Sequence, residues 1–196
     1  MKPIPLPRCF PILLLALWGC ASTPAANFFL LEPLPMPHQR EAAGFLLVTL
    51  ELGPIKIPAY LDRAQLVYAT ADNRYRLDEF NRWAEPLDDN IGRVLTIDLQ
   101  NALGAKVLPP HSPLADQTTY KIALNVLQFH RDGLNQAILN ADWLISQQGK
   151  QLVQTPFNCA QLVRGDTAAD QVAALNTCLN QLSGKLADNV KSLLRR

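Results

Sequence analysis

The side chains that could perform acid–base or covalent chemistry are few and lie far apart in this 196-residue sequence. His38, His111 and His130 each stand alone, so their spacing predicts neither a metal site nor a histidine-based catalytic triad. Asp88 and Asp89 are adjacent, and neighbouring residues of a helix do not converge on one substrate. The sequence also contains no Gly-x-Ser-x-Gly nucleophile motif and no phosphate-binding glycine loop. We therefore expect a protein that is not an enzyme, with no catalytic residues, no metal and no cofactor.

The N-terminal segment has the pattern of a secretory signal. Lys2 and Arg8 supply positive charge, and residues 10–18 form an apolar run that is too short to cross a bilayer. Charge and length together predict a signal peptide over residues 1–19. The alternative is a buried N-terminal strand with a spare cysteine.

The end of this segment suggests a covalent modification. Leu17, Gly19 and Cys20 have a spacing that resembles the lipobox of bacterial lipoproteins, in which the cysteine accepts a diacylglyceryl group. Two or more acyl chains, such as palmitate, hold a protein stably on a membrane, because each buried methylene contributes about 0.8 kcal/mol. We therefore expect lipid on Cys20 and a short tether over residues 20–26. Alanine, not aspartate, follows the cysteine, which resembles lipoproteins sent to the outer membrane.

Two further cysteines form an even pair in the expected mature chain. Cys9 would leave with the signal peptide and Cys20 would carry lipid, so Cys159 and Cys178 remain. An oxidising compartment favours a disulfide between them. A bridge that closes a loop of this size contributes on the order of 3 kcal/mol. Two buried free thiols are the alternative.

The composition limits the class of protein. The chain has 18 Lys and Arg against 17 Asp and Glu, and 48% of its residues are hydrophobic. The apolar content suffices for a core, so the mature chain should fold as one domain. Without a basic excess, a nucleic-acid partner is not expected.

Patterns of apolar residues predict mostly strands, separated by turn residues. The expected strands span residues 27–34, 45–52, 64–69, 75–80, 120–129, 137–145 and 151–159. Gly53-Pro54 interrupts the second strand, which continues briefly over 55–57. The last three form an antiparallel meander, and Pro156 makes the final strand an edge candidate.

Two amphipathic stretches predict helices, at residues 86–103 and 168–194. Gly104 would end the first helix, and Thr167 with Asp170 approximates a capping box at the start of the second. Together the elements predict an α+β fold over residues 27–196. It would be a single domain with a largely antiparallel sheet, two main helices packed on it and a long C-terminal helix.

Two segments combine proline, an aromatic residue and arginine just outside regular structure. They span residues 53–63, with Tyr60 and Arg63, and residues 81–87, with Arg82 and Trp83. Tyrosine, tryptophan and arginine often dominate the energy of protein interfaces. These residues either brace a loop on the core or present an anchor to a partner.

The same segments resemble the PqiC-like family of ABC-type transport auxiliary lipoproteins. The matching residues are Pro58 with Tyr60-Leu61-Asp62-Arg63, and the run from Arg82 and Trp83 to Leu87. The lipobox, the Phe-Phe-Leu of the first strand, the late strand with Trp143 and the long C-terminal helix match in the same order. The resemblance covers nearly all of the expected mature chain.

The resemblance implies a docking role at the outer membrane. Such lipoproteins look like the anchored partner of a transporter whose periplasmic component carries mammalian-cell-entry (MCE) domains, in systems associated with lipid movement between membranes and with envelope integrity. Pro58, Tyr60, Leu61, Arg63, Arg82 and Trp83 are then the family-motif or partner-binding residues. A homo-oligomeric ring of copies at the periplasmic face of the outer membrane is one arrangement.

Two alternative functions remain open. One is a lipoprotein that itself binds a lipid or another hydrophobic ligand, with a cavity near Leu95 and Leu182. The other is a lipoprotein that assists assembly of an outer-membrane or secretion component.

Overall fold

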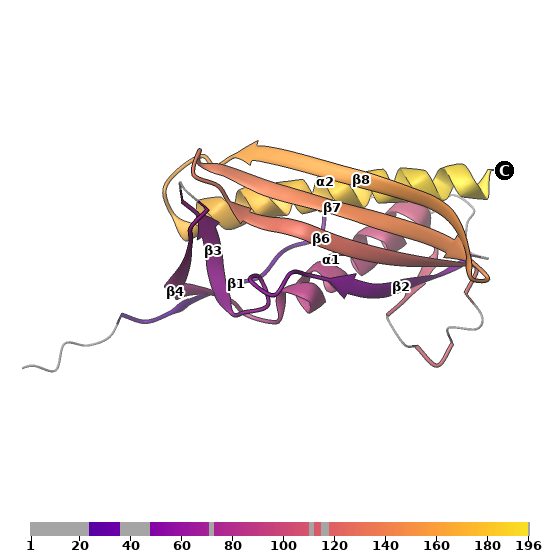
Figure 1. The fold of residues 1–196 in the computed structure, drawn as a ribbon. Coiled ribbons are helices and arrows are strands. Elements are labelled where there is room, and N and C mark those ends of the chain that lie inside the picture. Colours follow the sequence, from indigo (N-terminus) through magenta and orange to yellow (C-terminus); the bar gives the residue numbers. More distant parts are fainter. Residues whose placement is uncertain (1–23, 36–47, 71–72, 110–111, 115–117, 196) are drawn as a thin grey trace, which may run out of the picture.

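Figure 1 shows the computed structural model, which describes residues 24–35, 48–70, 73–109, 112–114 and 118–195. The expected signal peptide and Cys20 therefore lie outside the described residues, as do His38 and His111. Within the described part, an eight-stranded sheet is combined with two helices, which confirms the α+β class. The elements are β1 (Asn27–Phe29), β2 (Thr49–Lys56), β3 (Gln65–Ala69), β4 (Tyr75–Trp83), α1 (Leu87–Leu103), β5 (Lys106–Leu108), β6 (Tyr120–Arg131), β7 (Gln136–Gln147), β8 (Lys150–Leu162) and α2 (Ala168–Leu194).

The long strands β6, β7 and β8 form the predicted antiparallel meander. Their tight turns use residues with positive φ, which are Asn135 before β7 and Gln148 and Gly149 before β8. Among the described strands, β8 pairs with β7 alone, and it carries Pro156, so the prediction of an edge strand is also confirmed.

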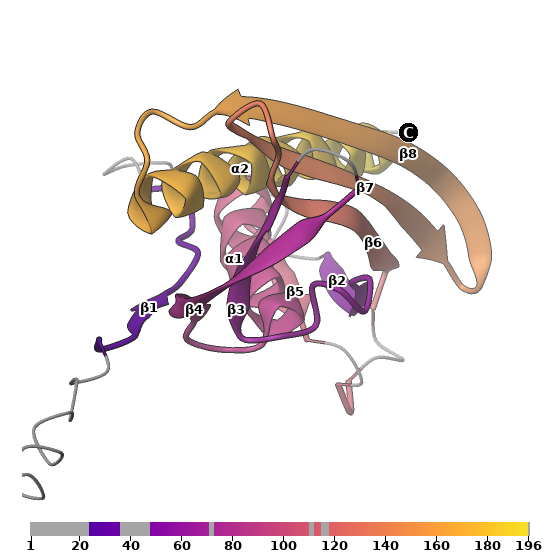
Figure 2. The same ribbon diagram turned by 60° about the vertical axis from the view of Figure 1, so that its left-hand side comes forward.

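β7 pairs with one edge of β6, and two different strands, β2 and β3, pair with parts of the other edge. β2 runs parallel to residues 120–125 of β6, whereas β3 meets β6 only where Tyr68 is opposite Arg131. The sheet therefore forks, and we call the interval at residues 126–130 the fork. β5 extends the branch of β2, while β4 and β1 extend the branch of β3 (Figure 2). The meander and the β3–β4 hairpin supply most of the pairing, and short parallel pairs make the sheet mixed.

As predicted, Gly53-Pro54 interrupts the regular pairing of β2 with β6, and the strand continues beyond it: the register is irregular between Leu52 and Ile55, and β2 ends at Lys56. A side chain at residue 53 would come within 3.0 Å of the carbonyl oxygen of Ile122. Glycine is therefore favoured at this position, because the backbone of β6 leaves little space for a side chain. The irregularity lets the strand pass the proline without losing its place beside β6.

Both helices cover the same face of the sheet (Figures 1 and 2). α1 packs on β2 and β5, α2 packs on the meander, and the two helices contact each other. Leu95 of α1 and Leu182 of α2 are fully buried in the core between these layers. Gly104 adopts the left-handed conformation that ends α1.

The start of α2 is fixed by the predicted capping box. The Thr167 hydroxyl accepts a hydrogen bond from the backbone N–H of Asp170, and the Asp170 carboxylate accepts one from the backbone N–H of Thr167. The hydrogen bonds from Thr167 lower the pKa of the Asp170 carboxyl group. The cap therefore prefers the charged carboxylate, which also suits the positive end of the helix.

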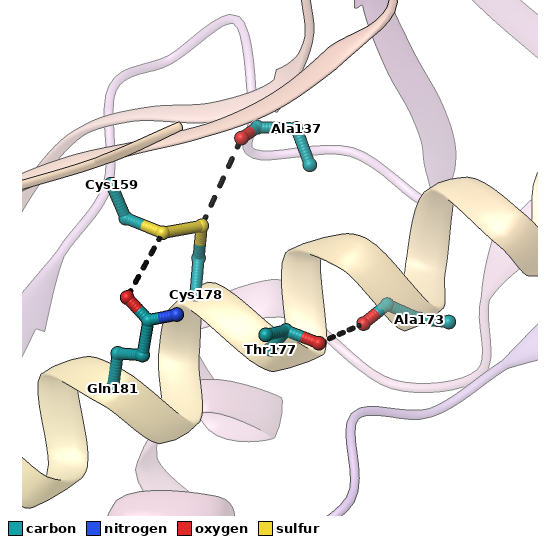
Figure 3. Close-up of a disulfide and its surroundings, with 6 residues drawn as sticks. All are labelled: Ala137, Cys159, Ala173, Thr177, Cys178 and Gln181. Carbon is teal, nitrogen blue, oxygen red and sulfur yellow. Dashed lines mark hydrogen bonds between the residues drawn. A yellow bond between two sulfur atoms is a disulfide. The ribbon is translucent and has the colours of Figure 1, made fainter. Parts of the chain in front are cut away.

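Cys159 and Cys178 form a disulfide, as expected (Figure 3). The bond joins the edge strand β8 to the middle of α2. Gln181 Oε1 lies 3.6 Å from Sγ of Cys159, and the carbonyl oxygen of Ala137 lies 3.8 Å from Sγ of Cys178. The bridge is therefore enclosed between the helix and the strands that the helix covers.

The segment after β1 is held by side chains instead of by strand pairing. We call residues 31–34 the strap. Asn90 and Asp98 of α1 accept hydrogen bonds from the backbone N–H groups of Leu31 and Leu34, at 3.0 and 2.8 Å. Asn176 of α2 accepts one from the N–H of Glu32 at 2.8 Å. The strap thus joins the N-terminal part of the chain to both helices.

Candidate docking surface at the fork of the sheet

The motif segment from Pro58 to Arg63 crosses the fork between β2 and β3. The backbone N–H of Leu61 donates to the carbonyl oxygen of Pro58 at 2.9 Å, and that of Arg63 donates to Leu61 at 2.8 Å. Leu61 is buried in the core. The segment is therefore a tight turn, held on the core by the buried Leu61. It places Tyr60 over residues 126–130 of β6, where the edge that faces away from β7 is paired with no strand in the described part of the chain.

Tyr60 covers the backbone of β6 at this interval. Its hydroxyl oxygen lies 3.2 Å from Nδ1 of His130 and 3.4 Å from the carbonyl oxygen of Leu127. The ring centroid lies 4.9 Å from that of Tyr75, and the Tyr75 ring lies 5.3 Å from the His130 ring. We call Tyr60, Tyr75 and His130 the fork cluster. The loop and the cluster supply the side-chain contacts that replace a missing strand.

Burial determines the protonation of the fork cluster. It raises the pKa of Tyr60 to about 12 and lowers the pKa of His130, an effect that nearby Asp132 opposes. Both side chains are therefore neutral near pH 7. A neutral phenol beside a neutral imidazole is suited to a hydrogen bond that fixes the loop.

Trp83 lies on the other side of the fork, in the core. It is 5% exposed, its ring centroid lies 6.1 Å from that of Phe129, and its backbone N–H donates to the carbonyl oxygen of Ala64. Trp83 therefore connects the end of β4 to the residue that directly follows the motif segment. Of the two interpretations of this residue, the geometry favours bracing.

The two arginines of the motifs remain accessible. Arg82 donates to the carbonyl oxygen of Glu79 at 2.9 Å and pairs with its carboxylate at 3.4 Å. Arg63 donates to the carbonyl oxygen of Ala59 at 3.4 Å. Both interactions are local and exposed, so neither prevents a guanidinium from meeting a partner.

Sequence reasoning missed three members of this surface, which are Tyr75, Leu127 and His130. Leu127 sits at an irregular point in the pairing of β6 with β7 and is 53% exposed. The sequence carries one signal for it, because the alternation that holds from Tyr120 to Val126 slips by one residue there. His130 stood alone in sequence, since both tyrosines that contact it come from distant segments.

A separate hollow of about 440 Å³ lies between β2 and α1. Leu52, Ile55 and Ile97 supply apolar lining, and Asp88 and Asp89 also line it. A Cβ at residue 92 of α1 would lie 3.2 Å from Cδ1 of Ile55, so a glycine there keeps the helix close to the strand. The hollow therefore differs from the fork, because apolar side chains and two carboxyl groups line it together.

The described residues hold no group of three or more His, Cys, Asp or Glu side chains placed to bind a metal ion. Among them, neither helix has the length and apolar character to cross a membrane.

Comparison with known proteins shows which family this chain resembles in sequence. Residues 29–187 match the model of a family described as the ABC-type transport auxiliary lipoprotein component. The intermembrane transport lipoprotein PqiC of Escherichia coli K12 is 28% identical over 182 residues, which cover 91% of this chain and 95% of that protein.

Two solved structures share the fold. A crystal structure of an uncharacterized protein superposes with a TM-score of 0.72 at 22% identity, covering 85% of this chain and 99% of that one. A protein from Xanthomonas campestris gives a TM-score of 0.68 at 13% identity with the same coverage. The sequence match over most of the chain and the common fold agree, and the chain therefore belongs to the family of ABC-type transport auxiliary lipoproteins.

Proposed function

We propose that the protein is a lipid-anchored lipoprotein of the outer membrane that docks the MCE-domain periplasmic component of an ABC-type transport system. Through this docking it supports lipid transport between the membranes and the integrity of the envelope. The observation that carries the proposal is the family match over residues 29–187, together with a relative named as an intermembrane transport lipoprotein. The lipobox pattern at Cys20 supplies the anchor.

The docking surface that we propose is the open side of the fork. Arg63 and Leu127 are exposed there, and Tyr75 of the fork cluster is 46% exposed. A guanidinium beside aliphatic and aromatic surface is typical of the central part of protein interfaces. Leu61 and Trp83 act beneath this surface by holding the loop in place, while Tyr60 connects the two layers.

In-cell photocrosslinking of the full-length, lipidated chain tests this docking. The crosslinking residue replaces Arg63 in one variant and Leu127 in a second, and exposed Gln154 on the edge strand β8 serves as the matched control position. We expect an MCE-domain protein to be captured from the first two positions and not from the third. Self-crosslinks in the same experiment would support a ring of copies.

The other results contradict the docking proposal in distinct ways. Capture of an outer-membrane barrel or a secretion component would favour an assembly role. Capture of an MCE-domain protein from Gln154 alone would move the docking surface to the far edge. Separately, Cys20→Ser should abolish attachment to the outer membrane, and unchanged fractionation of that variant would refute the lipid anchor.

The hollow between β2 and α1 favours a second candidate function, the binding of a hydrophobic ligand. Its apolar lining could hold part of an acyl chain, whereas Leu95 and Leu182 are fully buried in the core and do not line this hollow. Gly92→Leu would obstruct the hollow. Gly184→Leu is the matched control, because a Cβ at this glycine of α2 meets nothing within 4 Å.

Denaturing extraction of the purified protein separates these candidates. If the hollow binds lipid, lipid should be recovered from the parent and from Gly184→Leu but not from Gly92→Leu. Extraction of no lipid from the parent would contradict the second candidate and leave the docking proposal intact.

A further inference from the structure

The three most exposed large apolar side chains of the described residues lie at one end of the molecule, together with Phe80. Leu134, Phe28 and Leu162 are 77%, 64% and 60% exposed, and Phe80 is 44% exposed. They come from the β6–β7 turn, from β1, from the last residue of β8 and from β4. In Figure 1 all four of these places are at the left-hand end, where α2 begins. We call these four side chains the end face.

Backbone contacts hold two of these side chains at one corner. The N–H of Val163 donates to the carbonyl oxygen of Asn135 at 3.0 Å, and the Asn135 side chain donates to the carbonyl oxygen of Val163 at 3.2 Å. Leu134 and Leu162 each precede one of these residues. These hydrogen bonds therefore hold the β6–β7 turn, which carries Leu134, beside the end of β8, which carries Leu162.

The other two side chains lie at a neighbouring corner. Phe28 of β1 is paired with Arg82 of β4, two residues after Phe80. Phe28 also lines a surface hollow together with Thr167 and Ala168, at the start of α2. Three residues of chain separate Val163 from Thr167, so the start of α2 connects the two corners.

The route of the N-terminal chain brings this end, and not the opposite one, towards a lipid on Cys20. The chain advances seven residues from Cys20 to Asn27. Fully extended, seven residues span at most about 25 Å. α2 has 27 residues and a length of about 40 Å, so its far end is out of reach of such a tether. The strap prevents residues 31–34 from adding slack, because α1 and α2 hold their backbone.

We propose that the end face lies on the membrane, with Phe28, Phe80, Leu134 and Leu162 at the boundary between headgroups and acyl chains. This rests on the lipid anchor of the proposed function. Apolar side chains beside an acyl anchor add buried area, and a second point of attachment converts a flexible tether into a fixed orientation. The neighbouring Arg164 and Asp166 have opposite charges, so the bilayer need not be anionic.

Tryptophan fluorescence in vesicles tests this orientation. The lipidated full-length protein is reconstituted into phosphatidylcholine vesicles with and without brominated lipid, as Phe28→Trp, as Leu162→Trp and as the parent. Leu152→Trp is the matched control, because Leu152 is exposed near the opposite end of β8. Buried Trp83 and Trp143 give a background that the parent measures.

We expect brominated lipid to quench the added emission of Phe28→Trp and Leu162→Trp and to leave that of Leu152→Trp unchanged. If the protein floats with the vesicles but the two end-face tryptophans are not quenched, the orientation is refuted and the anchor stands. Emission that is blue-shifted without lipid quenching would mean that a second copy covers the end face, which also refutes the proposal. Failure to float with the vesicles would overturn both the anchor and the orientation that depends on it.

Discussion

At the fork, side chains on the two faces of β6 are equally buried but are covered by different kinds of contact. Phe129 and His130 are neighbours on this strand, point to opposite faces and are equally buried, at 2% exposure. Phe129 lies on the side that the helices cover, where Trp83 packs against it. His130 lies on the side without a helix in the described structure, where Tyr60 and Tyr75 cover it.

This difference implies that side chains on the helix side mainly stabilise the fold, whereas those on the open side mainly set the position of the loop at the proposed docking surface. On the helix side, burial is apolar and is shared by several elements, so loss of one side chain leaves a cavity in a packed interior. On the open side, one loop provides the cover through a polar contact, so changes there should cost less and should act mainly on the position of the loop. Four predictions test this division.

The largest effect should follow Trp83→Ala. Removing a buried tryptophan side chain typically costs about 3–5 kcal/mol, because apolar contacts are lost and a cavity remains. Trp83→Phe is the control, since a ring against Phe129 is retained, and it should lose clearly less. Chemical denaturation of the purified variants measures the free energy of unfolding. An unchanged value for Trp83→Ala would remove the bracing role.

Loss of the disulfide should cause the next largest loss of stability, without changing the surface at the fork. Replacement of both Cys159 and Cys178 by alanine should lower the free energy of unfolding by about 3 kcal/mol, because the unfolded chain is no longer cross-linked. Crosslinking from Leu127 at the fork should persist in this variant at a temperature where it remains folded. Loss of that crosslink from the folded variant would mean that the two sides are coupled.

A smaller effect is expected from Tyr60→Phe. The ring and its contacts remain, and the lost hydroxyl contacts to His130 and Leu127 correspond to about 0.5–1.5 kcal/mol. Tyr75→Phe is the matched control, because Tyr75 enters the fork cluster through ring contacts. A change as large as that of Trp83→Ala would contradict the division between the two sides.

The smallest effect should be the contribution of His130 to the pH dependence of the free energy of unfolding. Burial lowers the pKa of His130 below its usual 6.5, so the unfolded chain takes up this proton before the folded chain does. The stabilisation is therefore complete above pH 6.5 and is lost as the pH falls from 6.5 through the lower pKa of the folded state. His130→Phe should lack this loss. The test compares unfolding free energies of parent and variant across that range, and parallel curves would contradict it.

Local signals predicted the helix side well. The apolar stripe of residues 168–194 and the pair Thr167 and Asp170 identified the bounds and the cap of α2, and strand alternation identified the meander. These features depend on residues that are near one another in sequence. Cys178 could be matched to Cys159 for the same reason, because its place on the helix stripe turns it towards the sheet.

The fork could not be predicted from local patterns. Its parallel pairs join β2 and β6, about seventy residues apart, and β5 is too short to leave a period in the sequence. The motif residues were recognised by their types, yet the burial of Trp83 and the exposure of Arg63 depend on which strands meet above and beneath them. His130 gained its partners only through this tertiary arrangement.

The strap also gives the protein a mechanical property. Any tension on a lipidated N-terminus enters the domain through the backbone of Leu31, Glu32 and Leu34, which is tied to Asn90 and Asp98 on one helix and to Asn176 on the other. The force is therefore divided between two helices that pack against each other. One of them, α2, is covalently joined to the sheet by the disulfide. A domain pulled by a moving partner on one side and a membrane on the other would resist as one piece.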